Sequence, residues 1–164
     1  MSRTSGIIVT VQTFGGSGSC YVCAVFLDRY YGPWKKGALK RVCVPKEIWT
    51  NHPNVFRYLN IAVSSVPYYS HKFQAVAFGE LINLLDHILN QSVVVLQVAA
   101  NNPTGCDLSQ AQWNFLVDVF RQKGHFAFFD AAYLGLASGN HDRDSANGGN
   151  ASVRIDTHRV DSWL

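Results

Sequence analysis

Residues 92–139 read SVVVLQVAANNPTGCDLSQAQWNFLVDVFRQKGHFAFFDAAYLGLASG, and this stretch decides the fold. Its two fully apolar runs, 93–96 and 126–129, are typical of strands covered on both faces. A polar loop and a helical pattern separate them, which predicts parallel pairing through a right-handed crossover. Asn102 and the Asp130/Tyr133 pair follow the two strands. They are therefore expected at the carboxyl edge of the sheet, where open α/β folds bind ligands.

The intervening segment carries a complete set of helix signals. Ser109 with Gln112 three residues later predicts a capping box, and Gly124 predicts the end of the helix. Asp130 then closes the second apolar run, and a carboxylate there is costly unless a positive or hydrogen-bonding group meets it. The apolar face of this helix is expected to comprise Trp113, Leu116, Val117 and Phe120.

The N-terminal part predicts a strand over 7–14, a glycine turn over 15–19 and a helix from about 20 to 31. A glycine turn before a helix exposes backbone N–H groups and the positive end of the helix dipole, which suits a phosphate, and Ser17 or Ser19 can add a hydroxyl. Cys20 and Cys23 form a C-x-x-C pair without a second pair to complete a zinc site, so no metal is expected. We interpret them as two small apolar side chains on one helix face.

The middle of the chain continues the alternation of strands and helices. A short strand is expected over 41–45, a short helix and a β-rich run within 56–66, and an amphipathic helix through Leu81, Leu84, Leu85 and Ile88. Residues 32–40 are expected to form a basic, solvated connection. The fold class predicted is α/β, with three α/β/α layers around a mostly parallel sheet.

The loop Asn102-Pro103-Thr104-Gly105 and the segment Asp130-Ala131-Ala132-Tyr133, at this spacing, resemble the large domain of the aspartate and aromatic aminotransferases. These are fold-type I enzymes that use pyridoxal 5'-phosphate. Residues 11–18, VQTFGGSG, are similar to the cofactor-phosphate segment of that family, and residues 49–52, WTNH, to its ring-binding segment. The resemblance runs from about Val9 to Gly139, so residues 1–139 are expected to form a partial large domain and 140–164 an irregular tail.

The resemblance implies a role for each candidate residue. Gly15, Gly16 and Ser17 would bind the phosphate, and Trp49 would stack on the pyridine ring. Asp130 would pair with the protonated ring nitrogen, while Asn102 and Tyr133 would hydrogen-bond the phenolic oxygen. Asn51 would lie in the pocket and His52 would support Asp130 from behind. Considered without the family, Trp49 is better interpreted as a core aromatic and His52 as a helix-start residue. For Asp130 and Tyr133 the alternatives are a strand-end cap and a packing aromatic, and their joint spacing with Asn102 favours the functional role.

Two departures from the family matter for activity. The Schiff-base lysine of the family lies downstream of the Asp-x-Ala-Tyr motif, and the chain ends before that point, so no catalytic residue is assigned. Gln97 and Asn101 stand where relatives usually carry histidines. We therefore expect a truncated aspartate aminotransferase-like protein. The family reaction is amino transfer between an amino acid and a 2-oxo acid, and this chain alone is expected not to catalyse it.

Composition limits the other possibilities. A net charge of +3 over 164 residues is too small and too scattered along the chain to indicate nucleic-acid binding. No apolar run reaches the roughly 18 residues that a membrane helix needs. A soluble, cytoplasmic protein is the expectation, although the sequence does not separate the cytoplasm from an organelle. The family is homodimeric, and uncovered apolar faces predict self-association of a fragment. Two alternatives stay open: a non-catalytic fragment that binds pyridoxal phosphate or a partner, and an independent α/β nucleotide-binding module.

Overall fold

The computed structural model describes residues 11–146 and 154–155, and its centre is a parallel five-stranded sheet. The strand order is β2 (Ala62–Val66), β1 (Arg41–Pro45), β5 (Val93–Gln97), β6 (Phe126–Asp130) and β7 (Arg154–Ile155). Every neighbouring pair in this sheet is parallel. The predicted parallel α/β sheet is therefore confirmed.

Strands β5 and β6 form the centre of the sheet because both are apolar on both faces. All five residues of β5 are buried, and so are four of the five in β6. Their register pairs Val93 with Phe126 at one end and Gln97 with Asp130 at the other. Gln97 and Asp130 are thus neighbours at the carboxyl edge of the sheet.

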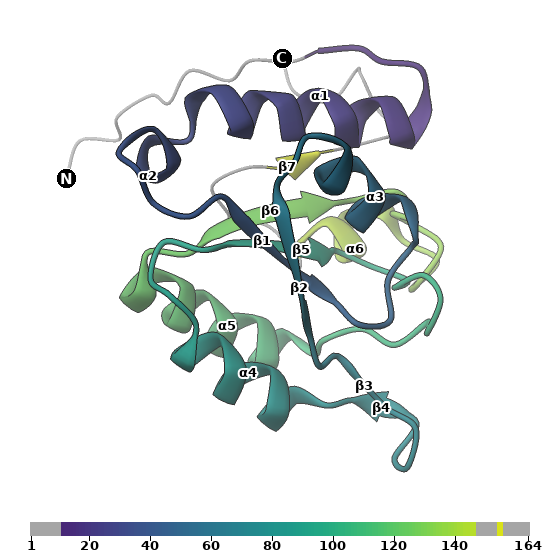
Figure 1. Ribbon diagram of the computed structural model, residues 1–164. Helices are drawn as coiled ribbons and strands as arrows, with labels where there is room; N and C mark the ends of the chain where they lie inside the picture. The colour runs from purple at the N-terminus through teal and green to yellow at the C-terminus, as the bar shows by residue number, and fades with distance from the viewer. Residues whose placement is uncertain (1–10, 147–153, 156–164) are drawn as a thin grey trace, which may run out of the picture.

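Helices cover both faces of the sheet and give the three layers that the sequence predicts (Figure 1). Helices α1 (Gly15–Tyr30), α2 (Gly32–Lys35) and α3 (Asn51–Tyr58) lie on one face. Helices α4 (Phe78–His87) and α5 (Gln110–Lys123) lie on the other. Each layer has its own apolar core, with Phe56 and Phe128 fully buried in the first and Leu81 and Leu85 in the second.

Helix α5 has the ends that its sequence predicts. The Ser109 side chain accepts a hydrogen bond from the Gln112 backbone N–H at 3.3 Å, and the Gln112 side chain accepts one from the Ser109 backbone N–H at 2.8 Å. Gly124 ends the helix with φ of 64°, a conformation that glycine adopts without a steric cost. Trp113, Leu116 and Phe120 are buried against the sheet, as expected, whereas Val117 is only partly buried and Val119 is buried with them.

The predicted start of helix α1 was wrong. The helix begins at Gly15, five residues before the expected position, so the glycine turn is its first turn. Glycine is a poor helix former by about 1 kcal/mol. Packing of Cys20, Ala24 and Leu27 on the sheet overrides that preference. Residues 11–14 are not in a strand, and the rest of the strand predicted over 7–14 lies outside the described residues.

The remaining differences are local. Residues 32–35 form the short helix α2 inside the expected connection, and α3 begins at Asn51, ahead of the expected start at 56. An antiparallel hairpin, β3 (Tyr69–Ser70) and β4 (Ala75–Val76), follows β2. Helix α6 (His141–Ala146) and strand β7 lie where an irregular tail was expected. Within α6, the buried Asp144 accepts hydrogen bonds from three backbone N–H groups of the preceding turn, which fixes the helix there.

Candidate functional site

The site begins at Asp130, the last residue of β6, which is 3% exposed. Its Oδ2 atom accepts a hydrogen bond from Gln97 Nε2 at 3.3 Å and lies 2.9 Å from His52 Nε2. The His52 ring N–H is within ion-pair distance but is not aligned for a hydrogen bond. The second oxygen, Oδ1, is buried without a hydrogen-bond partner among the described residues. An unsatisfied buried carboxylate oxygen at a sheet edge favours a donor that comes from a ligand.

Gln97 connects Asp130 to the loop after β5. Its Oε1 atom accepts hydrogen bonds from the Asn102 backbone N–H at 2.8 Å and from Asn101 Nδ2 at 3.1 Å. Asn101 Oδ1 in turn accepts the Thr104 hydroxyl at 2.7 Å. The polar interior of this edge is therefore a continuous network of side-chain amides.

The Asn102 side chain donates a hydrogen bond from Nδ2 to the Tyr133 hydroxyl at 3.1 Å. The loop that carries Asn102 is held by Asp107, which accepts the backbone N–H groups of Ala100 at 2.7 Å and Asn101 at 3.0 Å. Ala100 has φ of 49°, a left-handed conformation that alanine rarely adopts. A strained backbone persists only where surrounding hydrogen bonds hold it, and such residues are concentrated at ligand sites and active sites.

Helix α3 and the turn before it bring three further predicted residues to the site, Trp49, Asn51 and His52. His52 is fully buried behind Asp130, and the Trp49 ring packs edge-on against the His52 ring, with centroids 5.3 Å apart. Asn51, the neighbour of His52, donates a hydrogen bond from Nδ2 to the Ser17 hydroxyl at 3.1 Å. Two consecutive residues, Asn51 and His52, thus join the glycine turn to Asp130.

The N-terminus of α1 is open for an anion. Phe14, at the N-cap position, gives no side-chain cap, and the first turn has no acidic residue. The first backbone N–H groups of the helix, from Gly15, Gly16 and Ser17, therefore keep their positive potential. The Thr13 and Ser19 hydroxyls lie 2.6 Å apart and order this turn.

The structure thus links the candidate residues Ser17, Trp49, Asn51, His52, Asn102, Asp130 and Tyr133 through a chain of contacts. Three residues with no role predicted from the sequence hold this chain of contacts together: Gln97, Asn101 and Asp107. One signal was available for Gln97: it is the polar last residue of a buried strand, directly opposite Asp130.

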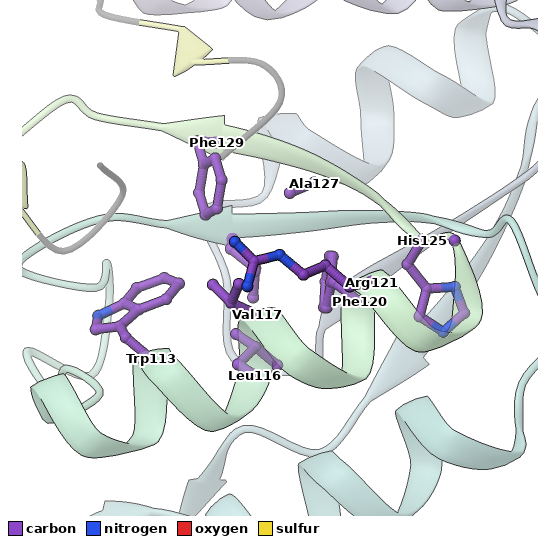
Figure 2. Close-up of a pocket in the computed structure, with 10 residues that line it drawn as sticks. Trp113, Leu116, Val117, Phe120, Arg121, His125, Ala127 and Phe129 are labelled. Atoms are coloured by element: carbon purple, nitrogen blue, oxygen red, sulfur yellow. The ribbon is translucent and has the colours of Figure 1, made fainter. Parts of the chain in front are cut away.

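A cavity of about 270 Å³ lies elsewhere, between α5 and the sheet (Figure 2). Its wall is mainly apolar, with Leu116, Phe120 and Phe129, and Arg121 lies at its rim. Both ring nitrogens of His125 are engaged, one with the Ser92 backbone N–H and the other with the Leu85 carbonyl. None of the candidate site residues lines this cavity.

The two cysteines of the C-x-x-C pair lie on α1, Cys20 buried and Cys23 partly buried against the same core. Burial raises the pKa of the Cys20 thiol to about 12, with the negative charge of Asp130 adding to the effect. Burial also raises the pKa of Cys23. Both thiols are therefore weak nucleophiles, in agreement with the interpretation of two packing residues. No group of three potential metal ligands occurs among residues 11–146.

The fold defines the class of protein: an α/β domain with helices on both faces of a parallel sheet and a buried polar network at the carboxyl edge of that sheet, where open α/β folds bind ligands. The family model for aminotransferase class I and II matches residues 7–162. The chain therefore belongs to the class I and II aminotransferase family. The match extends beyond Gly139, where the resemblance was expected to end.

Individual relatives agree with this assignment. The mitochondrial aspartate aminotransferase of Xenopus tropicalis is 38% identical over 141 residues, which are 86% of this chain and 32% of that protein. The cytoplasmic aspartate aminotransferase of Dictyostelium discoideum is 36% identical over 138 residues, 84% of this chain and 30% of that protein. The aromatic-amino-acid aminotransferase of Burkholderia pseudomallei, solved covalently bound to pyridoxal phosphate, superposes with a TM-score of 0.78 at 28% identity, over 87% of this chain and 36% of that one.

The chain spans about a third of the length of the relatives that it matches. Similar proteins include mitochondrial, cytoplasmic and chloroplastic enzymes, so membership of the family does not fix a compartment. In the part of the chain that the structure describes, no helix is long and apolar enough to cross a membrane.

Proposed function

We propose that this chain forms the cofactor-binding part of an aspartate-type transaminase and binds pyridoxal 5'-phosphate without a covalent bond. The observation that carries the proposal is the buried Oδ1 atom of Asp130, which has no hydrogen-bond partner among the described residues. A pyridinium N–H fits this atom, because a buried carboxylate needs a positive or hydrogen-bonding partner. When bound, the cofactor supplies an electron sink for amino-group chemistry.

Each candidate residue then has one task. Asp130 would accept the ring N–H and hold that nitrogen protonated. Asn102 and Tyr133, which already share a hydrogen bond of 3.1 Å, would donate to the phenolic oxygen. The uncapped N-terminus of α1 would bind the phosphate through the backbone N–H groups of Gly16 and Ser17.

His52 and Trp49 would complete the pocket. His52, fully buried, stays behind the carboxylate and keeps its Oδ2 side closed. Trp49 would lie against the face of the pyridine ring, and Asn51 would keep Ser17 in place through the bond between them. Amino acid and 2-oxo acid would be the substrates of the complete transaminase.

The 164-residue chain is proposed not to catalyse amino transfer by itself. Four of its six lysines have their ammonium groups engaged away from the site: Lys40 with Asp28, Lys123 with Asp86, Lys35 over Tyr30 and Lys72 over Phe73. A covalent bond to the cofactor would need a lysine at the ring's aldehyde carbon, which lies opposite the nitrogen that Asp130 would hold and next to the phenolic oxygen. Dimerisation, as in the family, also belongs to this proposal.

Calorimetric titration with pyridoxamine 5'-phosphate tests the proposal. This form of the cofactor has no aldehyde, so surface lysines do not capture it and only the shaped site contributes. We expect saturable one-to-one binding that Asp130→Asn weakens by about tenfold or more, the contribution of one charged hydrogen bond. Asp118→Asn, which changes a carboxylate that is 78% exposed, is the matched control and should leave the affinity unchanged.

Two results would contradict the proposal. One is binding that Asp130→Asn and Asp118→Asn leave equally strong. The other is a single stoichiometric lysine adduct, found after borohydride reduction with pyridoxal phosphate, together with transaminase turnover.

The second candidate function is a nucleotide-binding module, which the uncapped, glycine-rich N-terminus of α1 favours. Titration with ATP and NAD under the same conditions separates it from the first. Tight nucleotide binding with no response to pyridoxamine phosphate would establish the module and reject the transaminase site.

A further inference from the structure

We propose that Gln97 is a positioning residue that couples the two ends of the cofactor ring site through one side-chain amide. One end of the site is the Asp130 carboxylate, proposed for the ring nitrogen. The other is the Asn102–Tyr133 pair, proposed for the phenolic oxygen. The inference rests on the proposed function, and it adds a residue for which the residue pattern alone predicted no role.

The network fixes the orientation of the Gln97 amide. Its Oε1 atom receives two donors, the Asn102 backbone N–H at 2.8 Å and Asn101 Nδ2 at 3.1 Å, while its Nε2 atom donates to Asp130 Oδ2 at 3.3 Å. A flipped amide would set N–H against N–H at Asn102 and oxygen against oxygen at Asp130. Only one orientation therefore satisfies both ends.

This orientation decides which oxygen of Asp130 faces the ligand. Gln97 and His52 both occupy the Oδ2 side, and Oδ1 is left buried without a hydrogen-bond partner in the part of the chain that the structure describes. The side chain of Gln97 starts directly opposite Asp130 in the register of two parallel strands, so the sheet itself sets their spacing. Rotation of the carboxylate would break the bond to Gln97.

The same amide sets the position of the phenolic-oxygen contact. The Asn102 N–H bond to Gln97 fixes the backbone of the residue whose side chain donates to Tyr133. A shift at Asp130 is therefore transmitted to Asn102 through a path of two hydrogen bonds. The ring nitrogen and the phenolic oxygen of the cofactor lie at a fixed distance from each other. The coupling through Gln97 would therefore keep Asp130 and the Asn102–Tyr133 pair at the spacing that the ring requires.

A first experiment needs no ligand. Gln97→Glu keeps the acceptor for Asn102 but loses the donor to Asp130, and Gln97→Met loses both. We expect hydrogen exchange at the Asn102 amide to stay slow in Gln97→Glu and to accelerate at least about tenfold in Gln97→Met.

Gln110→Glu, on the exposed surface of α5, is the matched control for added charge. Circular dichroism confirms that each variant folds. Gln97→Glu has the shape of the native side chain and carries the test alone if Gln97→Met does not fold. Exchange at the Asn102 amide that is at least about tenfold faster in Gln97→Glu than in Gln110→Glu would overturn the proposal, and so would exchange in a folded Gln97→Met that stays as slow as in the native chain.

A second experiment measures coupling in the bound state. Asp130→Asn and Tyr133→Phe are combined in a double-mutant cycle for the affinity of pyridoxamine 5'-phosphate. In the native background their effects should depart from additivity by at least about threefold, and with Gln97→Met they should become additive. Additivity in both backgrounds, with normal binding by the native chain, would reject the role of Gln97 and leave the proposed function standing. Absence of binding by the native chain would reject the proposed function, while the ligand-free experiment still decides the hydrogen-bond role of Gln97.

Discussion

Asp107→Ala should release the loop that presents Asn102, because Asp107 holds two consecutive backbone N–H groups of that loop. A hydrogen bond to a charged acceptor contributes about 1.5–3 kcal/mol. Asp107 is only partly buried, so the lower figure applies to each bond, and the two together give about 3 kcal/mol. Ala100, held at φ of 49°, would relax when the bonds are lost and return about 1 kcal/mol of strain. The expected net loss in the free energy of unfolding is therefore about 2 kcal/mol.

Urea denaturation gives this free energy, and amide hydrogen exchange localises the change. We expect the amides of Ala100 and Asn101 to lose protection in Asp107→Ala, and the affinity for pyridoxamine phosphate to fall with them. Asp118→Ala, at a position 78% exposed, is the control and should change the free energy of unfolding by less than about 0.5 kcal/mol. The reasoning is refuted if Asp107→Ala unfolds at the native urea concentration with both amides still protected.

Three further outcomes follow from single positions. Ala100→Gly should stabilise the protein by about 1 kcal/mol in urea denaturation, because glycine adopts φ of 49° without strain, and no gain would show that the loop is unstrained. Phe128→Ala should cost about 3–5 kcal/mol through the cavity it leaves beside the fully buried Phe56 ring in the first core, whereas Phe73→Ala, 72% exposed, should cost less than about 0.5 kcal/mol; equal losses would contradict this. Burial lowers the pKa of His125 below its ordinary value of 6.5, so the unfolded chain binds the proton more readily and stability falls as the pH drops below about 6.5. The slope of unfolding free energy against pH from 5.5 to 7.5 should be smaller in His125→Gln, and an unchanged slope would exclude His125 as its source.

The central strands were predictable because their residues leave little choice. Four consecutive apolar residues in each of 93–96 and 126–129 suit only a strand covered on both faces, and both are central strands of the sheet. Helix α5 was equally predictable, since Ser109, Gln112 and Gly124 determine its ends locally. In these segments, local preference and tertiary packing agree.

The prediction was wrong where packing overrides a local signal. Glycine and serine at 15–19 indicate a turn, but the buried face of α1 extends the helix back to Gly15. Residues 141–146 have no clear period, yet the buried carboxylate of Asp144 gathers three backbone N–H groups and forms α6. The first effect depends on packing against distant strands, and the second on backbone N–H groups six to nine residues before Asp144, which lie outside the helix that they stabilise.

The candidate site shows the same division. Asp130, Asn102 and Tyr133 were found from their places after two strands, and the structure joins them through one network. Gln97 and Asp107 were not assigned roles, because an amide or carboxylate that satisfies backbone N–H groups looks like any polar loop residue in a sequence. Only the register of β5 against β6 shows why position 97 must be polar.

The measurement that tests the central claim most directly is nitrogen NMR of pyridoxamine 5'-phosphate labelled at the ring nitrogen and bound to the native chain. If Asp130 Oδ1 accepts the ring N–H, that nitrogen stays protonated at a pH at which the free cofactor has lost the proton, and Asp130→Asn abolishes the difference. A bound ring nitrogen that deprotonates at the same pH as the free cofactor would contradict the account.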